Sequence, residues 1–208
     1  MRIFRPPLLF RLLYPGAIFR YNAHTNRIYL TFDDGPAAGV TREIANVLEN
    51  EGIKATFFCC GKAAEEYPEL TDLIRRAGFG LGNHGYHHVK GWETSLTKYV
   101  ENTNKGADIT GSHLFRPPFG SLTPRQFFRL RKDHRVVFWD LMLYDFDPEF
   151  DRSKILAILK RRIRPGSVIV LHDNKLSSSP EILADIIRTI KDMGYTFGEL
   201  VKDAWPTS

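Results

Sequence analysis

Apolar and polar positions follow two rhythms along this chain from about residue 27 to its end. Short apolar runs bounded by turn-forming residues are typical of buried strands, and such runs lie at 27–32, 54–59, 79–82, 114–115, 135–139, 167–171 and 195–197. Apolar residues at three-to-four spacing predict helices, at 41–51, 63–77, 154–163 and 181–193, with Pro68 as a candidate break in the second. Strands that alternate with helices predict a parallel sheet with right-handed crossovers, either an open doubly wound sheet or a closed barrel.

Polar clusters come directly after four of the predicted strands. Asp33, His84, Arg116 and His172 each follow a strand within a few residues. The carboxyl ends of strands converge in a barrel, and barrels gather catalytic residues from several strands at that edge. A doubly wound sheet would scatter some of these residues, so the pattern favours a barrel with one cleft.

Composition predicts one globular domain. The chain has 208 residues, of which 43% are apolar and 25% charged, and such a chain buries a single large core. No stretch reaches the roughly 18 uninterrupted apolar residues of a membrane span. Cys59 and Cys60 are adjacent in a predicted strand and would point to opposite faces, so we expect both to be reduced packing residues.

The formal net charge of +5 raises the question of a polyanionic partner. The basic residues are spread out, and the densest run, at 160–164, lies at the end of a predicted helix. Cations there offset the helix dipole without any ligand. The sequence has no aromatic and basic groove pattern and no recognised nucleic-acid module, so we expect no nucleic-acid partner.

The N-terminal residues 1–26 stand apart from the alternating pattern. Their start is basic, but Arg5, Pro6, Pro7 and Arg11 interrupt the apolar run before it reaches the length of a secretory signal. We expect an N-terminal extension that packs on the barrel or touches a membrane surface. A cytoplasmic location, or one peripheral to the inner membrane, is favoured over export.

Asp34, His84 and His88 are candidate metal ligands. A carboxylate and two imidazoles suit Zn, Fe, Co, Ni or Mn and leave positions open for water and substrate. The two histidines are four residues apart, which on a helical turn places them on one face. The alternative is a turn in which Asp33 and Asp34 cap backbone amides, beside an incidental histidine pair.

The remaining polar residues are candidates for acid and base chemistry. Asp33 is a candidate base, and Arg116, on a loop stiffened by two prolines, can hold it by a forked salt bridge. His172 is a candidate general acid that Asp145 would orient. The alternatives are an ordinary surface ion pair for Arg116, a strand cap for His172 and a turn former for Asp145.

Taken in order, these segments resemble the polysaccharide deacetylase family, carbohydrate esterase family four, whose catalytic domain is called the NodB homology domain. The resemblance covers residues 27–201 and rests on Thr-Phe-Asp-Asp-Gly-Pro, His-x-x-x-His, Arg-Pro-Pro-Phe-Gly and the acid and His-Asp clusters near the end. It implies an α/β fold, a distorted, partly open (β/α)7-8 barrel. The catalytic domain would then span 27–208.

The resemblance also implies roles for single residues. Asp33 would be the base, with Arg116 as its partner, and Asp34, His84 and His88 the metal ligands. His172 would be the acid, and Asp145 its orienting carboxylate. The residues implied or suspected to contact substrate are Pro117, Phe119 (through its backbone N–H), Phe146, Leu171 as a wall of the acetyl pocket, and Trp92 by stacking on a sugar ring.

Three positions depart from the family pattern. Gly85 stands where Ser or Thr usually follows the first metal histidine, which predicts a looser loop and weaker metal retention. Phe119 replaces a frequent Tyr, a change that leaves the backbone group in place. Phe146 replaces a frequent Trp beside the bulky segment 142–144, which leaves the shape of the acetyl pocket and the choice of substrate open.

The leading hypothesis is a metal-dependent hydrolase of linear amide C–N bonds. It would remove acetate from an N-acetylated sugar in a glycan, peptidoglycan or glycolipid, or from an O-acetyl ester, with Zn as the favoured metal and Co, Ni, Mn or Fe as alternatives. The competing hypothesis is a catalytically silent carbohydrate-binding or envelope-associated protein on the same fold. Turnover separates the two, whereas metal content does not.

Overall fold

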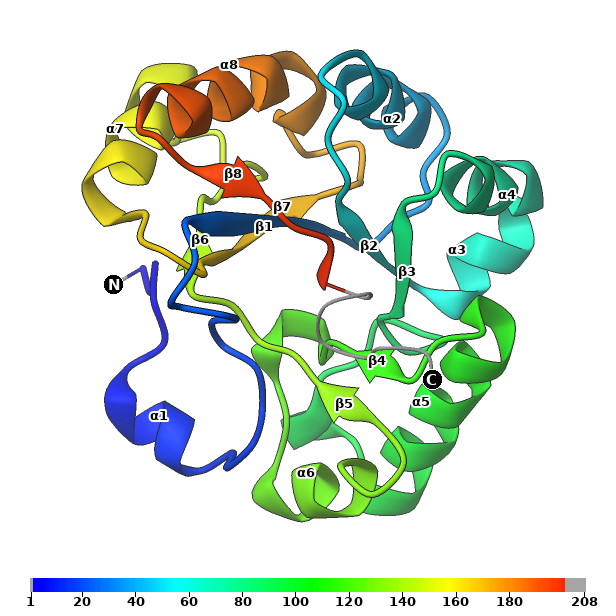
Figure 1. The fold of residues 1–208 in the computed structure, drawn as a ribbon. Coiled ribbons are helices and arrows are strands. Elements are labelled where there is room, and N and C mark those ends of the chain that lie inside the picture. The colour runs from blue at the N-terminus through cyan, green and yellow to red at the C-terminus, as the bar shows by residue number, and fades with distance from the viewer. Residues whose placement is uncertain (1, 201–208) are drawn as a thin grey trace.

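One parallel sheet runs through the computed structural model, which describes residues 2–200. Seven strands follow the order β5-β4-β3-β2-β1-β7-β6, and β8 pairs with β1 beside this path. The strands are β1 Arg27–Asp33, β2 Thr56–Cys59, β3 Gly80–Asn83, β4 Leu114–Phe115, β5 Arg135–Val136, β6 Leu141–Met142, β7 Val168–His172 and β8 Thr196–Phe197. The sheet curls into a barrel that is open between its end strands β5 and β6 (Figure 1). The predicted fold class, a partly open α/β barrel, is confirmed.

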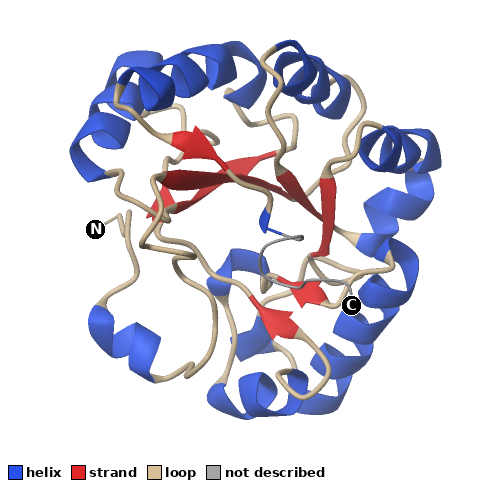
Figure 2. Cartoon of the chain, viewed as in Figure 1, coloured by secondary structure: helices blue, strands red, loops and turns tan. Residues whose placement is uncertain are grey.

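Helices cover the outside of this sheet (Figure 2). They are α1 Leu8–Leu12, α2 Val40–Asn50, α3 Gly61–Glu66, α4 Pro68–Arg76, α5 Leu96–Thr110, α6 Pro124–Leu130, α7 Arg152–Arg162 and α8 Ser179–Asp192, with short 3-10 turns η1 Gly91–Glu93 and η2 Pro118–Gly120. Pro68 divides the second predicted helix into α3 and α4, because a proline is tolerated in the first turn of a helix and not in its interior. The four helices predicted from the sequence are therefore confirmed, the second as two pieces.

Strand β1 shows that the two faces of the sheet have different surroundings: one packs against the outer helices, and the other faces the inside of the barrel. Adjacent strand residues point to opposite faces. Ile28, Leu30 and Phe32 pack in the main core with apolar residues of α2, α7 and α8. Tyr29 belongs instead to a smaller cluster that joins side chains from strands around the barrel. Asp33 has the same parity as Tyr29, so its carboxylate faces the barrel interior at the carboxyl end of the strand.

The N-terminal segment, residues 2–21, lies along the open side of the barrel. Ile18 forms a parallel bridge with Val137, just after β5. On the other side of the opening, the Met142 backbone N–H of β6 donates to the Phe4 carbonyl at 2.9 Å. The segment thus supplies backbone partners to both ends of the sheet.

Asp140, which lies between β5 and β6, holds this segment through ion pairs. Its buried carboxylate lies 3.3 Å from Arg5 and 3.2 Å from Arg11 of the segment. Arg164 also pairs with it, and the Ser167 hydroxyl donates to it at 2.8 Å. Burial alone would raise the pKa of Asp140, but these hydrogen bonds and positive charges lower it below its usual value.

Several elements differ from the sequence prediction. Helix α5 is the longest in the described chain, yet its two asparagines, Gly106 and threonines are weak helix formers, and no strong periodicity marks it. Helices α1 and α6 and strand β6 were likewise not expected. The predicted strand at 135–139 is wrong at its end: β5 stops at Val136, Val137 only bridges to Ile18, and residues 138–139 are not in a strand.

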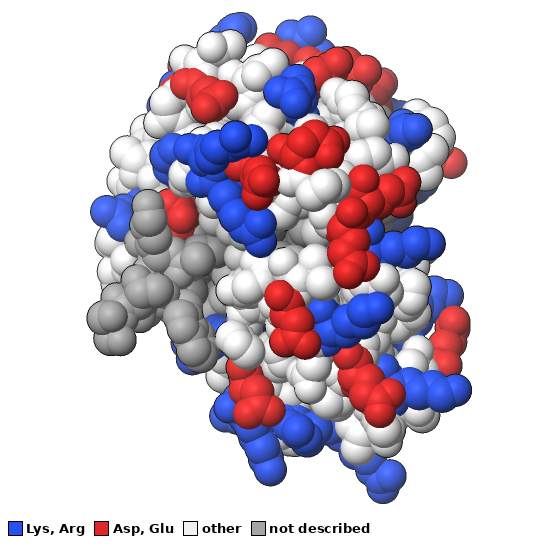
Figure 3. Space-filling model, turned by 90° about the vertical axis from the view of Figure 1, so that its right-hand side faces the viewer, with Lys and Arg blue, Asp and Glu red and all other residues white. Residues whose placement is uncertain are grey.

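Surface charge is mixed on the face that carries α3, α4 and α5, where acidic and basic side chains alternate (Figure 3). Cys59 and Cys60 are both buried and free, as predicted. Within residues 2–200, no helix combines the length and the apolar character that crossing a membrane requires.

Candidate active site

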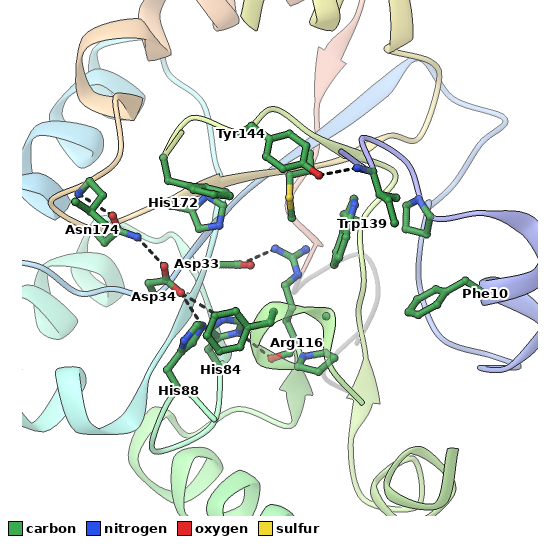
Figure 4. Close-up of a pocket in the computed structure, with 18 of the residues that line it drawn as sticks. Phe10, Asp33, Asp34, His84, His88, Arg116, Trp139, Tyr144, His172 and Asn174 are labelled. Atoms are coloured by element: carbon green, nitrogen blue, oxygen red, sulfur yellow. Dashed lines mark hydrogen bonds and ion pairs between the residues drawn. The ribbon is translucent and has the colours of Figure 1, made fainter. Parts of the chain in front are cut away.

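The carboxyl ends of the strands border a cavity of about 570 Å³. Residues that the sequence places far apart converge on it (Figure 4). Its polar lining consists of Asp33, Asp34, His84, His88, Arg116, His172 and Asn174. Six of these seven were predicted from the sequence; Asn174 was not.

Asp34, His84 and His88 form a compact triad in this cavity. The Asp34 Oδ1 atom lies 3.5 Å from His84 Nε2 and 3.1 Å from His88 Nε2. One ligand atom from each of the three residues can be chosen so that all lie within 4.8 Å of one another. Two atoms bound at about 2.1 Å to a tetrahedral ion would lie about 3.4 Å apart, so the spacing fits a mononuclear metal.

The expected helical turn that brings the two histidines together is wrong. Residues 84–88 form a loop, in which Gly85 has a φ of 77°. Asn83 and Asn102 hold this loop: the Gly85 N–H donates to the Asn83 side chain, and the His87 N–H donates to the Asn102 side chain, each at 2.8 Å. These two hydrogen bonds tie both sides of Gly85 to neighbouring side chains, and the looser loop and weaker metal retention expected from Gly85 stay a prediction.

Two further contacts orient the metal-ligand candidates. The His84 Nδ1 atom lies 2.8 Å from the Arg116 carbonyl, which leaves Nε2 toward the triad. The Asn174 amide donates to Asp34 Oδ2 at 2.7 Å, so Oδ1 remains for the histidines. Partners of this kind fix ring and carboxylate orientation at metal sites. The donor set and its support both fit a divalent ion.

The charge state of Asp34 also suits a metal ligand. Burial alone would raise the pKa of this carboxyl, but hydrogen bonds from His84 and His88 and the nearby His172 hold it well below its usual value. Asp34 therefore stays ionised through the neutral range.

Asp33 lies beside the triad and is held by Arg116. The Arg116 Nη1 atom donates to Asp33 Oδ1 at 2.7 Å, and both side chains are almost fully buried. The expected forked geometry is wrong: Nη1 also donates to the Thr31 hydroxyl, while Nη2 donates to the Phe138 carbonyl. Arg116 thus ties Oδ1 of Asp33 to the strand framework, and Asp33 lines the cavity.

His172 lies directly across from Asp33, because the two residues are paired in register between β7 and β1. Its Nδ1 atom is 2.8 Å from Asp145 Oδ1, and its backbone N–H donates to Asp145 Oδ2 at 2.7 Å. The hydroxyls of Ser177 and Ser179 donate to the same carboxylate. Asp145 is buried behind the histidine and does not line the cavity.

Burial and charge act in opposite directions on His172. Burial alone would lower its pKa, but the charge and hydrogen bond of Asp145, with the charges of Asp33 and Asp34, raise it to about 9. The imidazole is therefore protonated at neutral pH, with Nε2 as the remaining donor.

The predicted substrate-contact residues divide into two groups. Pro117, Phe119 and Phe146 line the cavity, and the Phe119 ring lies 4.3 Å from that of His88. Leu171 is fully buried in the main core and does not line the cavity, since adjacent residues of β7 face opposite sides. Trp92 lies on η1, is 67% exposed and is also absent from the lining.

Fold and site together define a barrel protein with a candidate mononuclear metal centre beside a candidate base, Asp33, and a candidate acid, His172. The polysaccharide deacetylase family model matches residues 20–136. A putative polysaccharide deacetylase of Bacillus subtilis, YheN, is 32% identical over 200 residues, which cover 87% of this chain and 69% of that protein. The chain belongs to the polysaccharide deacetylase family.

Solved structures agree with this assignment. The Bc1960 peptidoglycan N-acetylglucosamine deacetylase matches with a TM-score of 0.87 and 26% identity, over 95% of this chain and 96% of that one. BA3943 of Bacillus anthracis, described as a family pseudoenzyme, matches with a TM-score of 0.81 and 23% identity, over 95% and 74% of the two chains. The second likeness concerns the fold alone.

Proposed function

We propose that this protein is a metal-dependent deacetylase that hydrolyses the acetamide of an N-acetylated sugar in a glycan, peptidoglycan or glycolipid and releases acetate. One observation carries the proposal: Asp33 and His172 face each other across β1 and β7, and the Asp34, His84 and His88 triad lies in the same cavity. A structural use of Asp33 and Asp34 as turn caps would not explain the buried Arg116 or the paired histidines.

Asp34, His84 and His88 would hold the metal, and zinc is the ion that we propose. One carboxylate with two imidazoles, and space left for water and substrate, is a common catalytic zinc arrangement; Co, Ni, Mn and Fe suit the same donors. A bound divalent ion supplies Lewis acidity toward the acetyl carbonyl and lowers the pKa of water.

The chain's own residues would carry the proton transfers. Asp33, fixed by Arg116, accepts a proton from the water that attacks the acetyl carbon. The Phe119 backbone N–H donates to the oxygen that gains negative charge. His172 then donates its Nε2 proton to the sugar nitrogen as the C–N bond breaks. Acetate and an amino sugar leave.

Acetate release from N-acetylglucosamine oligomers, peptidoglycan fragments and acetylated esters tests this function. The metal-loaded protein should release acetate, a chelator should stop it, and Asp33→Asn should lower kcat by at least about a hundredfold, as loss of a general base does. Asp192→Asn, on α8 and outside the cavity, is the matched control.

The same assay decides between enzyme and silent binding protein. If folded, metal-loaded protein releases no acetate from any of these substrates, the deacetylase proposal fails and the silent carbohydrate-binding protein takes its place. Release that survives Asp33→Asn would instead reject the proposed base.

We further propose that the N-terminal segment touches a membrane surface, which favours a peripheral location for the protein. Leu8, Leu9 and Leu12 of α1 are 73%, 77% and 68% exposed. The Arg5 and Arg11 side chains beside them share the single carboxylate of Asp140 with Arg164, which leaves a surplus of positive charge. Exposed apolar residues next to cations suit anionic lipid.

Sedimentation with vesicles of anionic and of zwitterionic phospholipid tests this contact. The protein should sediment with the anionic vesicles, and Leu9→Gln with Leu12→Gln should weaken that binding. Leu96→Gln, at an exposed position on α5, is the matched control. Equal binding by all three proteins would overturn the proposal.

A further inference from the structure

The cavity has a polar end and an apolar remainder. Beyond the site residues, its wall is formed by side chains of the N-terminal segment and of the chain around β6. We call this part the apolar arm; it consists of Ile3, Pro6, Phe10, Trp139, Met142 and Tyr144. In the close-up view, Phe10 and Trp139 lie on one side of Arg116, away from the metal-ligand candidates (Figure 4).

Few polar groups in this part of the cavity are available to sugar hydroxyls. They are the Tyr144 hydroxyl, which accepts from the Ile3 N–H at 2.8 Å and keeps one O–H to donate, and the Trp139 indole N–H, which is buried without a hydrogen-bond partner among the described residues. These two donors are too few for the several hydroxyls of a sugar ring. The Asn174 amide, at the polar end, is bound to Asp34. Hydroxyl groups that leave water without new partners cost free energy. A second sugar ring is therefore a poor occupant for the apolar arm, whereas a hydrocarbon chain is a good one.

The position of the arm ties it to the reacting sugar. It belongs to the same cavity as Asp33 and His172, so a group attached to the sugar that loses its acetyl group can reach it. Its outer wall, from Ile3 to Phe10, continues into α1, whose leucines are exposed. A chain that leaves the arm would thus meet an apolar surface and not open water.

We propose that the apolar arm binds a hydrocarbon chain carried by the substrate, so that the substrate is an N-acetylated glycolipid. This inference rests on the proposed deacetylase function and names its substrate class. The chain confers affinity by burial of its methylene groups, and the acetamide is placed at the polar end of the cavity.

A series of N-acetyl-β-glucosaminides with methyl, butyl, hexyl and octyl groups, used below micelle-forming concentrations, tests the arm. Each methylene that enters it should raise kcat/KM about threefold to fourfold, the factor that corresponds to burial of one CH₂ group. Acetate release should therefore be far faster from the octyl than from the methyl compound, and faster than from N-acetylglucosamine oligomers.

Met142→Gln keeps the side-chain length but adds an amide to the wall, so the ratio of octyl to methyl kcat/KM should fall at least about tenfold. Met193→Gln, at an exposed position after α8, should leave the ratio unchanged. Ile3→Gln repeats the test at a partly exposed site of the arm, should Met142→Gln fold poorly.

The failures of the two proposals are distinguishable. Equal kcat/KM along the alkyl series, or a preference for the oligomers, overturns the apolar arm while the deacetylase stands. If no compound releases acetate, calorimetry of octyl against methyl glucosaminide binding to the same protein still decides the arm. Tighter octyl binding that Met142→Gln removes supports it, and equal binding overturns it.

Discussion

At the scale of single residues, the acid and the base of the proposed reaction are set by different surroundings. Asp33 shares its strand position with His172 across the sheet, yet Arg116 holds the carboxylate while Asp145 holds the imidazole. The Asp145 carboxylate raises the pKa of His172 and so keeps this residue protonated as a donor at neutral pH, whereas Arg116 fixes the position of the Asp33 carboxylate.

Asp145→Asn should shift the pH dependence of activity. Asp145 raises the pKa of His172; without its charge that pKa falls, so the protonated acid is lost at a lower pH. The alkaline limb of the kcat/KM profile should therefore move to lower pH, and kcat should drop about tenfold or more. Ser177→Ala removes a hydrogen bond to the same carboxylate and keeps its charge. The alkaline limb of the kcat/KM profile of this variant should therefore move much less. An alkaline limb that stays in place in Asp145→Asn would reject His172 as the acid.

At the scale of elements, the loop after β3 depends on a glycine that the family pattern would replace. Gly85 has a φ of 77°, and a Cβ atom there would lie 2.7 Å from the Asn102 amide nitrogen. The Asn102 side chain both accepts from the His87 N–H and donates to the His87 carbonyl. The absence of a side chain at Gly85 therefore leaves room for Asn102 to hold the loop.

Gly85→Ser, the apparent return to the family pattern, should destabilise this protein. Gly111→Ser is the matched control, because Gly111 has a φ of 67° and a Cβ atom there would meet nothing within 4 Å. Both variants bear the cost of a left-handed backbone, about 1–2 kcal/mol. Gly85→Ser should lose about a further 1 kcal/mol and release metal more readily, because it displaces Asn102. Urea unfolding measures the loss of stability, and metal competition measures the release of metal. If both variants lose the same free energy of unfolding, the Asn102 side chain can move away from residue 85 without destabilising the protein.

The buried strands could be predicted from the sequence, whereas the loop of the two histidines could not. Apolar runs mark β1, β2 and β7 because these strands are buried on both sides. The site residues Asp33 and His172 are the last residues of β1 and β7. The loop of His84 and His88 could not be foreseen, since its shape depends on Asn102, which lies in a helix with no strong periodicity. Leu171 was foreseeable: if His172 faces the interior, its neighbour on the strand faces the core.

At the scale of the whole molecule, one buried carboxylate connects the N-terminal segment to the barrel. Asp140 pairs with Arg5 and Arg11 from that segment and with Arg164, two residues after α7 ends. Its pKa is lowered in the folded state, so its contribution to stability is present above the unfolded value of 3.8. That contribution is lost as the pH falls through the lower, folded value.

Asp140→Asn should loosen the N-terminal segment. The three arginines are partly exposed, so water can solvate them once they lack a carboxylate partner. We therefore expect the free energy of unfolding to fall by about 1–3 kcal/mol at pH 7. Urea unfolding gives the loss, and hydrogen exchange should show faster exchange in residues 2–13. Asp133→Asn breaks an exposed pair with Arg129 and should cost less than about 1 kcal/mol. Unchanged exchange in Asp140→Asn would show that packing alone retains the segment.

The two walls of the cavity come from different parts of the chain. The reacting groups Asp33 and His172 sit on strands β1 and β7, which also build the core. The opposite wall is made by the first residues of the chain, which contribute no catalytic group. Mutations between Ile3 and Phe10 can therefore change which group attached to the sugar the cavity accepts, while the catalytic residues stay the same. Substrate preference can thus evolve through changes in residues 3–10 alone.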